Sequence, residues 1–334
     1  MLVVNLNPCI DWQYRVPQFK YGGMNRVRLT RRDVAGKGIN VCVALKNLGL
    51  DPLCMGFNFT ENGDALTSKL DELGIRHDFV NVPGAVRVNI KLYEDAGGEM
   101  TELNQPGGFV PEYARDELVD KIINANEYAE ILVLSGSRPE GVEARFYTRL
   151  CKAWRGKVFL DTEGEALRLA VKEAPPFALK PNLYELSTGF GITGEMLNPR
   201  EIAGFCRENI LQAGVSLICV SMGSKGAVLV TPDDSYYCPA LDIVAKGVQG
   251  AGDAMVAGLV YYTYKNEGEP LSAAMAAAAA SVIRDGTEMC SREDFEKMLG
   301  KMPKIFTVTT AQGAVPQRSG GLGAEPLFRR RQLK

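Results

Sequence analysis

The sequence predicts an α/β fold: a doubly wound, mainly parallel sheet flanked by helices, with a small β-sheet lid. Short, continuous apolar runs alternate with amphipathic segments, which is the pattern of repeated strand–helix–strand units. Two stretches, 10–34 and 85–105, instead alternate apolar and polar residues around glycine turns, as strands with one solvated face do. With 334 residues, 46% of them hydrophobic, the chain can form a large folded core.

Buried parallel strands are predicted where apolar runs are bounded by polar or glycine residues. These runs are LVVNL (2–6), ILVLS (131–135), KVFLD (157–161), FALK (177–180) and LICVS (217–221). Amphipathic segments at 111–129 and 141–155 are predicted helices between them. The two period-two stretches are predicted to form the lid, so that 1–310 is one domain with inserted lid strands.

Composition excludes several classes of function. The net charge of −2 does not favour nucleic acid or an anionic membrane as a partner. The chain has a single histidine, His77, which excludes HExxH zinc sites, and we expect it in a solvated loop. The eight cysteines form no CxxC motif and several lie in apolar runs, which indicates reduced thiols and a cytoplasmic protein. The sequence contains neither a signal-peptide pattern nor an apolar run of about 18 residues.

The end of the chain differs in composition. From about residue 311 it is rich in glycine, proline and arginine and has no periodicity. We expect 311–334 to be a tail that is disordered or added to the natural chain, with solvated arginines at 329–331. Its removal should therefore leave turnover unchanged.

A glycine-rich segment precedes a predicted helix at RDVAGKGINVCVALKNLGL (32–50). The free N–H groups and the positive dipole end of such a helix favour an anion, and Lys37 adds a positive charge. The segment is not a Walker A loop, because Arg31 and Gly38 stand where that motif needs glycine and serine or threonine. Taken alone, the segment is also compatible with a tight turn before a packed helix.

A second glycine-rich helix start lies in KGVQGAGDAMVAGLVYYT (246–263). Asp253 follows Gly250, Ala251 and Gly252 and directly precedes a long apolar run without charged residues. Met255 stands where a dinucleotide-binding GxGxxG motif needs glycine, which disfavours a dinucleotide-dependent oxidoreductase. The pattern predicts an anion hole that contains a carboxylate. The alternative is an aspartate at a helix start that only interacts favourably with the helix dipole.

Arg87, Asn89 and Lys91 are predicted to share one face of a strand, because their positions have the same parity. Two cations on one face predict a clamp for a phosphate that the substrate already carries. A solvated strand face is the alternative for these three residues alone.

Together, the motifs resemble the ribokinase-like (PfkB-type) sugar kinases, and within them the phosphosugar branch of 1-phosphofructokinases and tagatose-6-phosphate kinases. The similarity covers about 1–310, in family order, through NLNPCID, AGKGINVCVALKNLG, VRVNIK with TELNQPG, VLSGSRPEGV, DTEGEAL with ALKPNLYEL, VSMGSKGAVLV and QGAGDAMVAG. The resemblance implies ATP-dependent, Mg²⁺-assisted phosphorylation of a ketohexose monophosphate, and a homodimer through the lid. We expect fructose 1-phosphate as the substrate; a tagatose-6-phosphate kinase or a non-catalytic sugar-phosphate-binding protein are the alternatives.

The resemblance also implies roles for individual residues. Asp253 would be the catalytic base, and the anion hole would be formed by the amides around it, at Gly250, Ala251 and Gly252. The phosphosugar would contact Asp11, Gly36, Lys37, Gly38, Asn40, Arg87, Asn89, Lys91, Ser135 and Ser137. The nucleotide would contact Lys180, Asn182, Ser221, Gly223 and Gly226. Mg²⁺ and its water shell would be organised by Asn182 and Glu185.

Three positions depart from the pattern of the family. Ala35 replaces the first glycine of the usual GGKG, Arg138 stands where an apolar residue is usual, and Val248-Gln249 replaces Thr-Val. The first change is mild, while the other two bear on substrate fit and nucleotide contacts.

Overall fold

The fold is described from a computed structural model, which describes residues 1–192 and 198–309. The predicted tail at 311–334 lies outside the described residues. Among those residues, no helix is long and apolar enough to cross a membrane.

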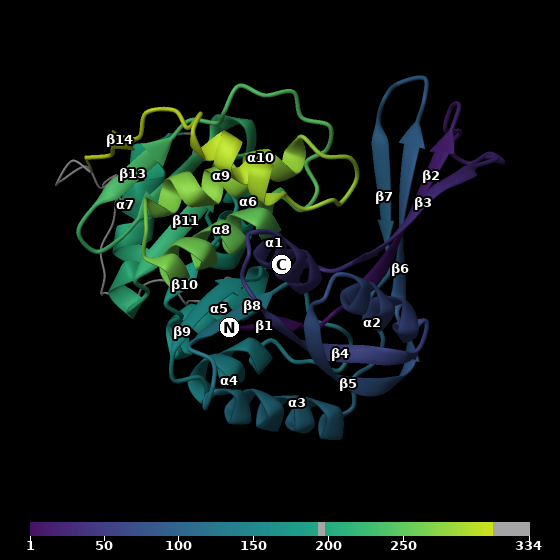
Figure 1. The fold of residues 1–334 in the computed structure, drawn as a ribbon, viewed down its shortest axis with the longest axis horizontal. Helices are drawn as coiled ribbons and strands as arrows, with labels where there is room; N and C mark the ends of the chain where they lie inside the picture. The colour runs from purple at the N-terminus through teal and green to yellow at the C-terminus, as the bar shows by residue number, and fades with distance from the viewer. Residues whose placement is uncertain (193–197, 310–334) are drawn as a thin grey trace, which may run out of the picture.

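A ten-stranded sheet forms the centre of the molecule (Figure 1). Its strands, in spatial order, are β14 (Phe306–Thr307), β13 (Ser235–Cys238), β12 (Ala227–Val230), β11 (Leu217–Ser221), β10 (Ala178–Leu179), β9 (Lys157–Asp161), β8 (Ile131–Ser135), β1 (Leu2–Asn5), β4 (Leu53–Glu61) and β5 (Arg76–Ala85). The strands from β11 to β5 pair in parallel, and β12, β13 and β14 add an antiparallel edge. This confirms the doubly wound, mainly parallel sheet, and the five predicted strands are β1, β8, β9, β10 and β11.

The sheet extends beyond β1 through β4 and β5, which the apolar-run pattern did not indicate. His77 belongs to β5, so its predicted loop position is wrong. Its ring stacks on Phe79 with the centroids 5.7 Å apart, and its side chain is 22% exposed beside Asp71. The edge strand β5 is only partly buried and therefore contains many polar residues. For this reason the sequence pattern favoured a loop at His77.

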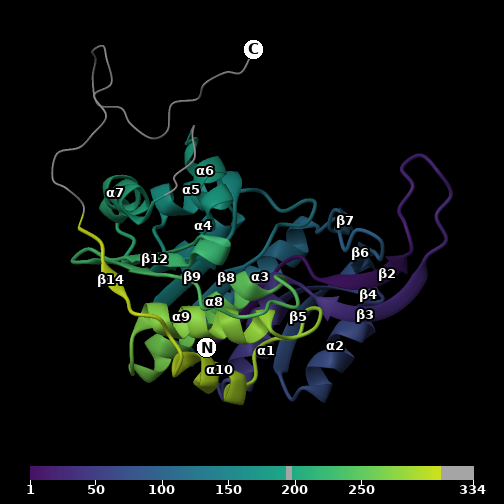
Figure 2. The same ribbon diagram turned by 90° about the horizontal axis from the view of Figure 1, so that it is seen from above.

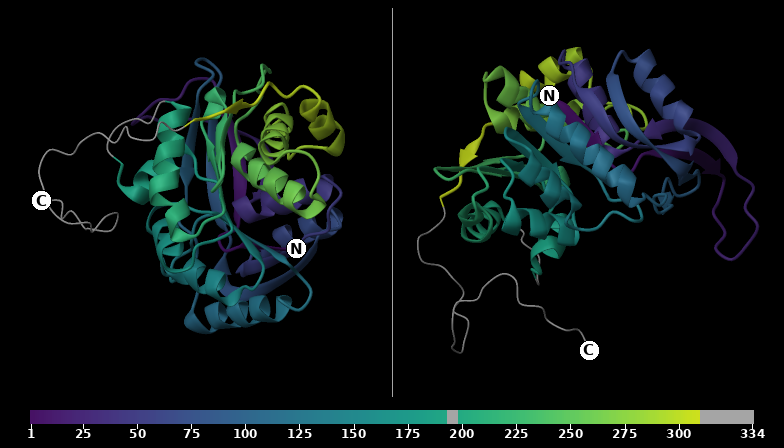
Figure 3. Two further views of the ribbon diagram at one scale, coloured as in Figure 1. Left: turned by 90° about the vertical axis from the view of Figure 1, so that its left-hand side faces the viewer. Right: turned by 90° about the horizontal axis from the view of Figure 1, so that it is seen from below.

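Helices cover both faces of this sheet (Figure 2; Figure 3, left). One face packs on α3 (Glu112–Ala125), α4 (Phe146–Ala153), α5 (Gly164–Glu173), α6 (Leu183–Phe190) and α7 (Pro199–Asn209). The other face packs on α1 (Lys37–Asn47), α2 (Gly63–Glu72), α8 (Ala251–Lys265), α9 (Pro270–Val282) and α10 (Arg292–Leu299). Leu2 and Val4 of β1 enter the first core and Val3 enters the second, as the alternation of side chains along a strand requires.

A four-stranded second sheet forms the lid and extends away from the main body (Figure 1; Figure 3, right). Its order is β3 (Arg28–Ala35), β2 (Cys9–Val16), β6 (Arg87–Glu94) and β7 (Met100–Asn104). The predicted lid is thereby confirmed. Along β2, Cys9, Asp11 and Gln13 are buried while Ile10, Trp12 and Tyr14 are only partly so, which is the half-solvated alternation that the sequence indicated.

Candidate active site

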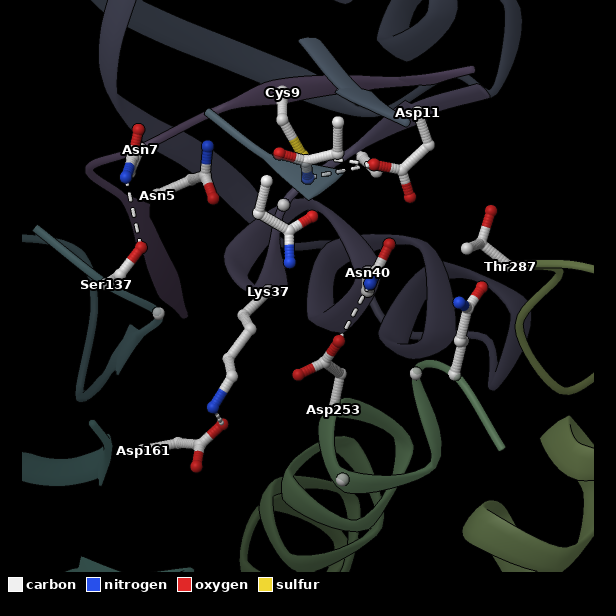
Figure 4. A pocket seen from close by; sticks show the side chains of 18 of the residues that line it. Asn5, Asn7, Cys9, Asp11, Lys37, Asn40, Ser137, Asp161, Asp253 and Thr287 are labelled. Atoms are coloured by element: carbon white, nitrogen blue, oxygen red, sulfur yellow. Dashed lines mark hydrogen bonds and ion pairs between the residues drawn. The ribbon is translucent and has the colours of Figure 1, made fainter. Parts of the chain in front are cut away.

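A pocket of about 530 Å³ lies between the lid and the carboxyl ends of the main-sheet strands (Figure 4). Strand ends contribute Asn5, Asp161 and Ser221, and the starts of α1 and α8 contribute Lys37 and Asp253. In open α/β sheets, ligands bind at this edge because the loops and helix N-termini converge there. The pocket is therefore suited to an anionic ligand.

Asp253 lies in the first turn of α8 and is 5% exposed. Its Oδ2 accepts a hydrogen bond of 2.7 Å from Nδ2 of Asn40 on α1 (Figure 4). Burial, with a further contribution from the charge of Asp161, raises the pKa of Asp253 to about 7, although Lys37, Asn40 and Lys180 act in the opposite direction. A carboxylate with a pKa near neutral pH is well matched to general-base chemistry.

The start of α8 has the geometry of an anion hole. Gly250, the N-cap residue, has a left-handed φ of 73°, and a Cβ there would lie 2.2 Å from Cε of Met289. The first N–H groups of a helix have no acceptor within it, which leaves those of Gly252 and Asp253 able to bind an anion. Ala251 does not line the pocket, and its N–H donates to the carbonyl of Val248 at 3.4 Å.

Two lysines and two carboxylates form a charged cluster at the floor of the pocket. Nζ of Lys37 lies 3.1 Å from Glu185 and 3.5 Å from Asp161, and Nζ of Lys180 lies 3.2 Å from Asp161. Burial opposes ionisation of Asp161, but Lys180, Lys37 and a hydrogen bond from Ser135 keep its pKa below the ordinary value. Burial likewise disfavours the charged form of Lys37, but the surrounding carboxylates raise its pKa. Asp161 and Lys37 therefore remain ionised at neutral pH.

Asp161 is a site residue that the sequence analysis missed. It ends β9 opposite Ser135 at the end of β8, and Oγ of Ser135 donates to Oδ2 of Asp161 at 3.1 Å. Ser135 itself is buried and does not line the pocket, so its contact is with Asp161. The position of an aspartate as the last residue of a predicted buried strand was the signal that could have identified it.

On the predicted nucleotide side, Asn182 and Glu185 form a capping box at the start of α6. Glu185 N–H donates to Oδ1 of Asn182 at 2.8 Å, and Asn182 N–H donates to Oε2 of Glu185 at 2.9 Å. This arrangement leaves Oε1 of Glu185 toward Lys37, at 3.1 Å. Lys180, Asn182, Glu185 and Ser221 all line the pocket.

Gly223 and Gly226 do not line the pocket. At Gly226, φ is +101° and a Cβ would lie 2.0 Å from the carbonyl oxygen of Cys238. Glycine is thus required there by the close approach of β13 to the turn before β12. Gly38 is explained in the same way, because a Cβ would lie 2.7 Å from Cβ of Asn5, and it too lies outside the lining residues.

The lid contributes the opposite wall. Lys91 is 5% exposed, and its Nζ lies 2.5 Å from Oδ2 of Asp11, whose Oδ1 accepts from Asn89 at 3.0 Å. The guanidinium of Arg87 donates instead to neutral oxygens, the backbone carbonyl of Gln105 at 3.0 Å and Oδ1 of Asn89 at 3.4 Å. All four residues line the pocket, as the shared parity of 87, 89 and 91 indicated. A phosphate would meet two different cations, because Asp11 neutralises Lys91 whereas the hydrogen-bond partners of Arg87 are uncharged.

Two asparagines, Asn5 at the end of β1 and Asn7 just after it, complete the wall between lid and sheet, and the sequence analysis did not single them out. Nδ2 of Asn7 donates to Oγ of Ser137 at 3.0 Å (Figure 4). Asn5 packs against Gly36 and Gly38 at the start of α1, and a Cβ at Gly36 would lie 2.7 Å from its Oδ1. Buried Nδ2 of Asn5 and Oδ1 of Asn7 have no protein partner, so both are available to a polar ligand. Both belong to the NLNPCID motif, which was the available signal.

Two of the departures from the family pattern differ in their position relative to the pocket. Arg138 donates to the carbonyl of Val142 at 2.6 Å and lies outside the lining residues, so it binds its own loop. Gln249 lines the pocket between lid and α8.

Within residues 1–192 and 198–309, no three acidic, histidine or cysteine side chains gather in a way that would hold a metal ion by themselves. Carboxylates of Asp161 and Glu185 nevertheless line the pocket. This donor set fits a Mg²⁺ that keeps most of its waters and is bound through substrate phosphates, which is the usual mode for this ion.

A buried carboxylate with a raised pKa, a helix start with free N–H groups beside it and a cationic lid opposite are typical of one class of protein: a phosphotransferase for a small polar acceptor. The chain belongs to the pfkB family of carbohydrate kinases, whose model matches residues 3–293. It is thus a sugar-phosphate kinase that transfers a phosphoryl group to an alcohol, which excludes the disfavoured oxidoreductase.

Individual relatives agree with this assignment. The chain is similar to the 1-phosphofructokinase of Escherichia coli K12, with 32% identity over 90% of this chain and 96% of the relative. It is also similar to that of Borreliella burgdorferi, with 31% identity over 89% and 95%. Among solved structures, Escherichia coli phosphofructokinase-2 in complex with fructose 6-phosphate has a TM-score of 0.80 and 26% identity, covering 90% of this chain and 98% of that one. Thermotoga maritima ribokinase shares the fold, with a TM-score of 0.72, 24% identity and coverage of 90% and 98%.

Proposed function

We propose that the protein uses ATP to phosphorylate fructose 1-phosphate to fructose 1,6-bisphosphate. The observation that carries this proposal is the position of Asp253: a buried carboxylate with a pKa of about 7, next to free helix N–H groups and opposite Arg87 in the same pocket. The similarity to 1-phosphofructokinases over most of the chain supports the choice of sugar.

In the proposed reaction, Asp253 accepts the proton of the acceptor hydroxyl as that oxygen bonds to the γ-phosphorus, and the bond from phosphorus to the ADP oxygen breaks. Asn40 holds Oδ2 of Asp253 in place, which orients the base. The N–H groups of Gly252 and Asp253 stabilise the charge of the transferring group. Glu185 and Asn182 would hold hydrated Mg²⁺, which when bound neutralises phosphate charge.

On the acceptor side, Arg87 and Lys91 are proposed to bind the phosphate that the sugar already carries, while Asp11, Asn89 and Lys37 contact its hydroxyls. A tagatose-6-phosphate kinase remains the alternative, because both sugars present one phosphate and a free hydroxyl to such a clamp. The tested quantity is kcat/KM with ATP for fructose 1-phosphate and tagatose 6-phosphate. We expect fructose 1-phosphate to give the higher value; the reverse order would assign the alternative, and turnover of neither would overturn both substrate assignments.

We also propose that the protein is a homodimer through the lid and acts in the cytoplasm. Large apolar side chains are exposed on the lid and its β2–β3 hairpin, namely Phe19, Tyr21, Met24, Val27, Leu29, Met100 and Leu103. Such a group of exposed apolar residues is typical of an interface. The eight cysteines are free and all lie in the described part, which supports a reducing compartment. Light scattering of the wild type and of a Tyr21→Ser, Met24→Ser variant tests the dimer, which the variant should weaken.

A further inference from the structure

Gln249 makes contacts that the family pattern does not provide, because valine is usual at this position. It directly precedes Gly250, the N-cap of the helix that carries Asp253. Its side chain reaches across the pocket to the lid, where Oε1 accepts a hydrogen bond of 2.7 Å from Lys91 and Nε2 donates one of 2.8 Å to Oε1 of Glu102. One side chain therefore joins the start of α8 to both β6 and β7.

These bonds belong to a continuous network. Lys91 and Glu102 are partners across the antiparallel β6–β7 pair, and Lys91 is also bound to Asp11 on β2 at 2.5 Å. The network includes three of the four lid strands, and its four side chains, Asp11, Lys91, Glu102 and Gln249, all line the pocket. Both bonds of Gln249 are to charged groups, and such bonds stabilise more than neutral ones.

The two partners have opposite requirements. The ammonium of Lys91 needs an acceptor, whereas the carboxylate of Glu102 needs a donor. A primary amide offers both at once, from two atoms on one carbon. Valine offers neither, and glutamate satisfies Lys91 but repels Glu102. The chemistry of the contact therefore selects glutamine.

We propose that Gln249 is a positioning residue that holds the lid against the start of α8 and so fixes the distance between the bound sugar and Asp253. Its kinetic consequence rests on the proposed phosphosugar kinase function, while the bridge itself does not. Fixing this distance matters because displacement of a reactant by about 1 Å can lower a rate roughly 100-fold.

The test is a rescue experiment between positions 249 and 102. Gln249→Glu keeps the acceptor for Lys91 but sets a carboxylate against Glu102, and kcat/KM for fructose 1-phosphate should fall about tenfold or more, with KM for ATP unchanged. Glu102→Gln alone keeps an acceptor for Nε2 but loses the charge of the acceptor, so its effect should be smaller than that of Gln249→Glu. Combining the two changes restores the bond with donor and acceptor exchanged, so the double variant should recover most of the lost kcat/KM.

Hydrogen–deuterium exchange of the unliganded protein measures the bridge without relying on activity. In Gln249→Val and Gln249→Glu, backbone amides of β6 and β7 should exchange about tenfold faster, and Glu102→Gln should restore protection only in the Glu variant. Glu99→Gln, which removes a charge from the same hairpin outside the bridge, serves as the matched control and should leave exchange unchanged.

Unchanged exchange in both Gln249 variants, or a double variant no better than Gln249→Glu, would overturn the inference. If the wild type turns over neither sugar phosphate while the exchange pattern follows the rescue, the bridge stands and the proposed function fails. Thermal melting of each variant excludes loss of the fold as the cause of faster exchange.

Discussion

At the residue scale, Asp253 differs from an ordinary helix-start aspartate in its burial. A solvated aspartate in a first helical turn interacts favourably with the dipole by about 0.3 to 1 kcal/mol, which lowers its pKa slightly. Asp253 is 5% exposed and its pKa is raised to about 7, so burial outweighs the favourable dipole. Its position is therefore better explained by chemistry than by helix stability.

Asp253→Asn should lower kcat by about 10² to 10⁴, because the amide cannot accept the hydroxyl proton. The apparent affinities for ATP and phosphosugar should change little, since the helix N–H groups and the lid residues remain. Steady-state kinetics with both substrates varied measures this. A stable variant with kcat within tenfold of the wild type would contradict the assignment of the base.

The pH dependence of the wild type follows from the same carboxylate. Only the deprotonated form is a base, so kcat/KM for the phosphosugar should fall as the pH decreases below about 7, the pKa of Asp253 in the unliganded protein, by about tenfold per pH unit. This folded-state value lies above the ordinary 3.8, so the free energy of unfolding should decrease as the pH rises from 3.8 to about 7. Asp253→Asn should remove that decrease and be more stable than the wild type at pH 8. Chemical denaturation of both proteins at the low end of this pH range and at pH 8 measures the difference. Equal stability of the two proteins at pH 8 would show that the carboxylate is not buried as described.

Arg87→Ala should weaken use of the phosphosugar by roughly 2 to 4 kcal/mol, because a charge-assisted contact to its phosphate is lost. The KM for ATP should be nearly unchanged. An equal loss of affinity for ATP and sugar in Arg87→Ala would refute its assignment to the sugar phosphate.

Lys91→Ala should lower the melting temperature, since it leaves the buried carboxylate of Asp11 without its cation.

At the element scale, the site depends on how closely α8 packs on its neighbours. At Gly258, in the middle of α8, a Cβ would lie 2.4 Å from the carbonyl oxygen of Ala273 on α9. The two helices pack directly against each other there, and α8 carries Asp253 at its start. The position of the base is thus fixed by helix packing as well as by Asn40.

Gly258→Ala should therefore destabilise the protein, although alanine favours a helix over glycine by about 1 kcal/mol. Overpacking against backbone typically costs about 1 to 3 kcal/mol, and here the neighbouring atom cannot move without its helix. Gly204→Ala in α7 is the matched control, because its Cβ would meet nothing within 4 Å, and it should be stabilising. Urea unfolding of both variants measures the difference; equal shifts would contradict the close packing of α8 on α9.

At the scale of the whole molecule, the pocket lies between two sheets that belong to different parts of the fold. The lid supplies Asp11, Arg87 and Lys91, and the main sheet with its helix starts supplies Lys37 and Asp253. A ligand that bridges the two should stabilise the folded protein as a unit. Because the sugar phosphate and the nucleotide are assigned to different walls, their stabilising effects should be separable.

Fructose 1-phosphate at 100 times its dissociation constant should stabilise the protein by about 2.7 kcal/mol, seen as a rise in melting temperature. Arg87→Ala should lose this rise at the same sugar concentration and keep the rise that ATP produces. Thermal shift measurements with each ligand alone test this. If Arg87→Ala retained the full shift with the sugar phosphate, the lid would not be its binding wall.

How far the sequence predicts the fold depends on the range of the interactions. Local hydrophobic patterns indicated five of the parallel strands and the alternation of β2, β3 and β6. A strand buried on both faces is a continuous apolar run, and a strand buried on one face alternates apolar and polar residues. They did not indicate β5, whose half-polar residues resemble a loop, and they cannot give the order of strands in the sheet. That order results from pairings between residues far apart in the chain, such as Leu2 with both Leu53 and Leu132.

For the site, the sequence by itself determined the residue types: glycines before two helices, Asp253 at a helix start, and two cations of equal parity on a lid strand. Only the tertiary structure decided what those residues meet. Burial raises the pKa of Asp253, the pairing of β8 with β9 brings Asp161 to Ser135, and Asp11 neutralises Lys91 while Arg87 bonds to uncharged oxygens. The physical reason is that desolvation and Coulomb energies depend on distances across the fold, whereas a sequence records only neighbours along the chain.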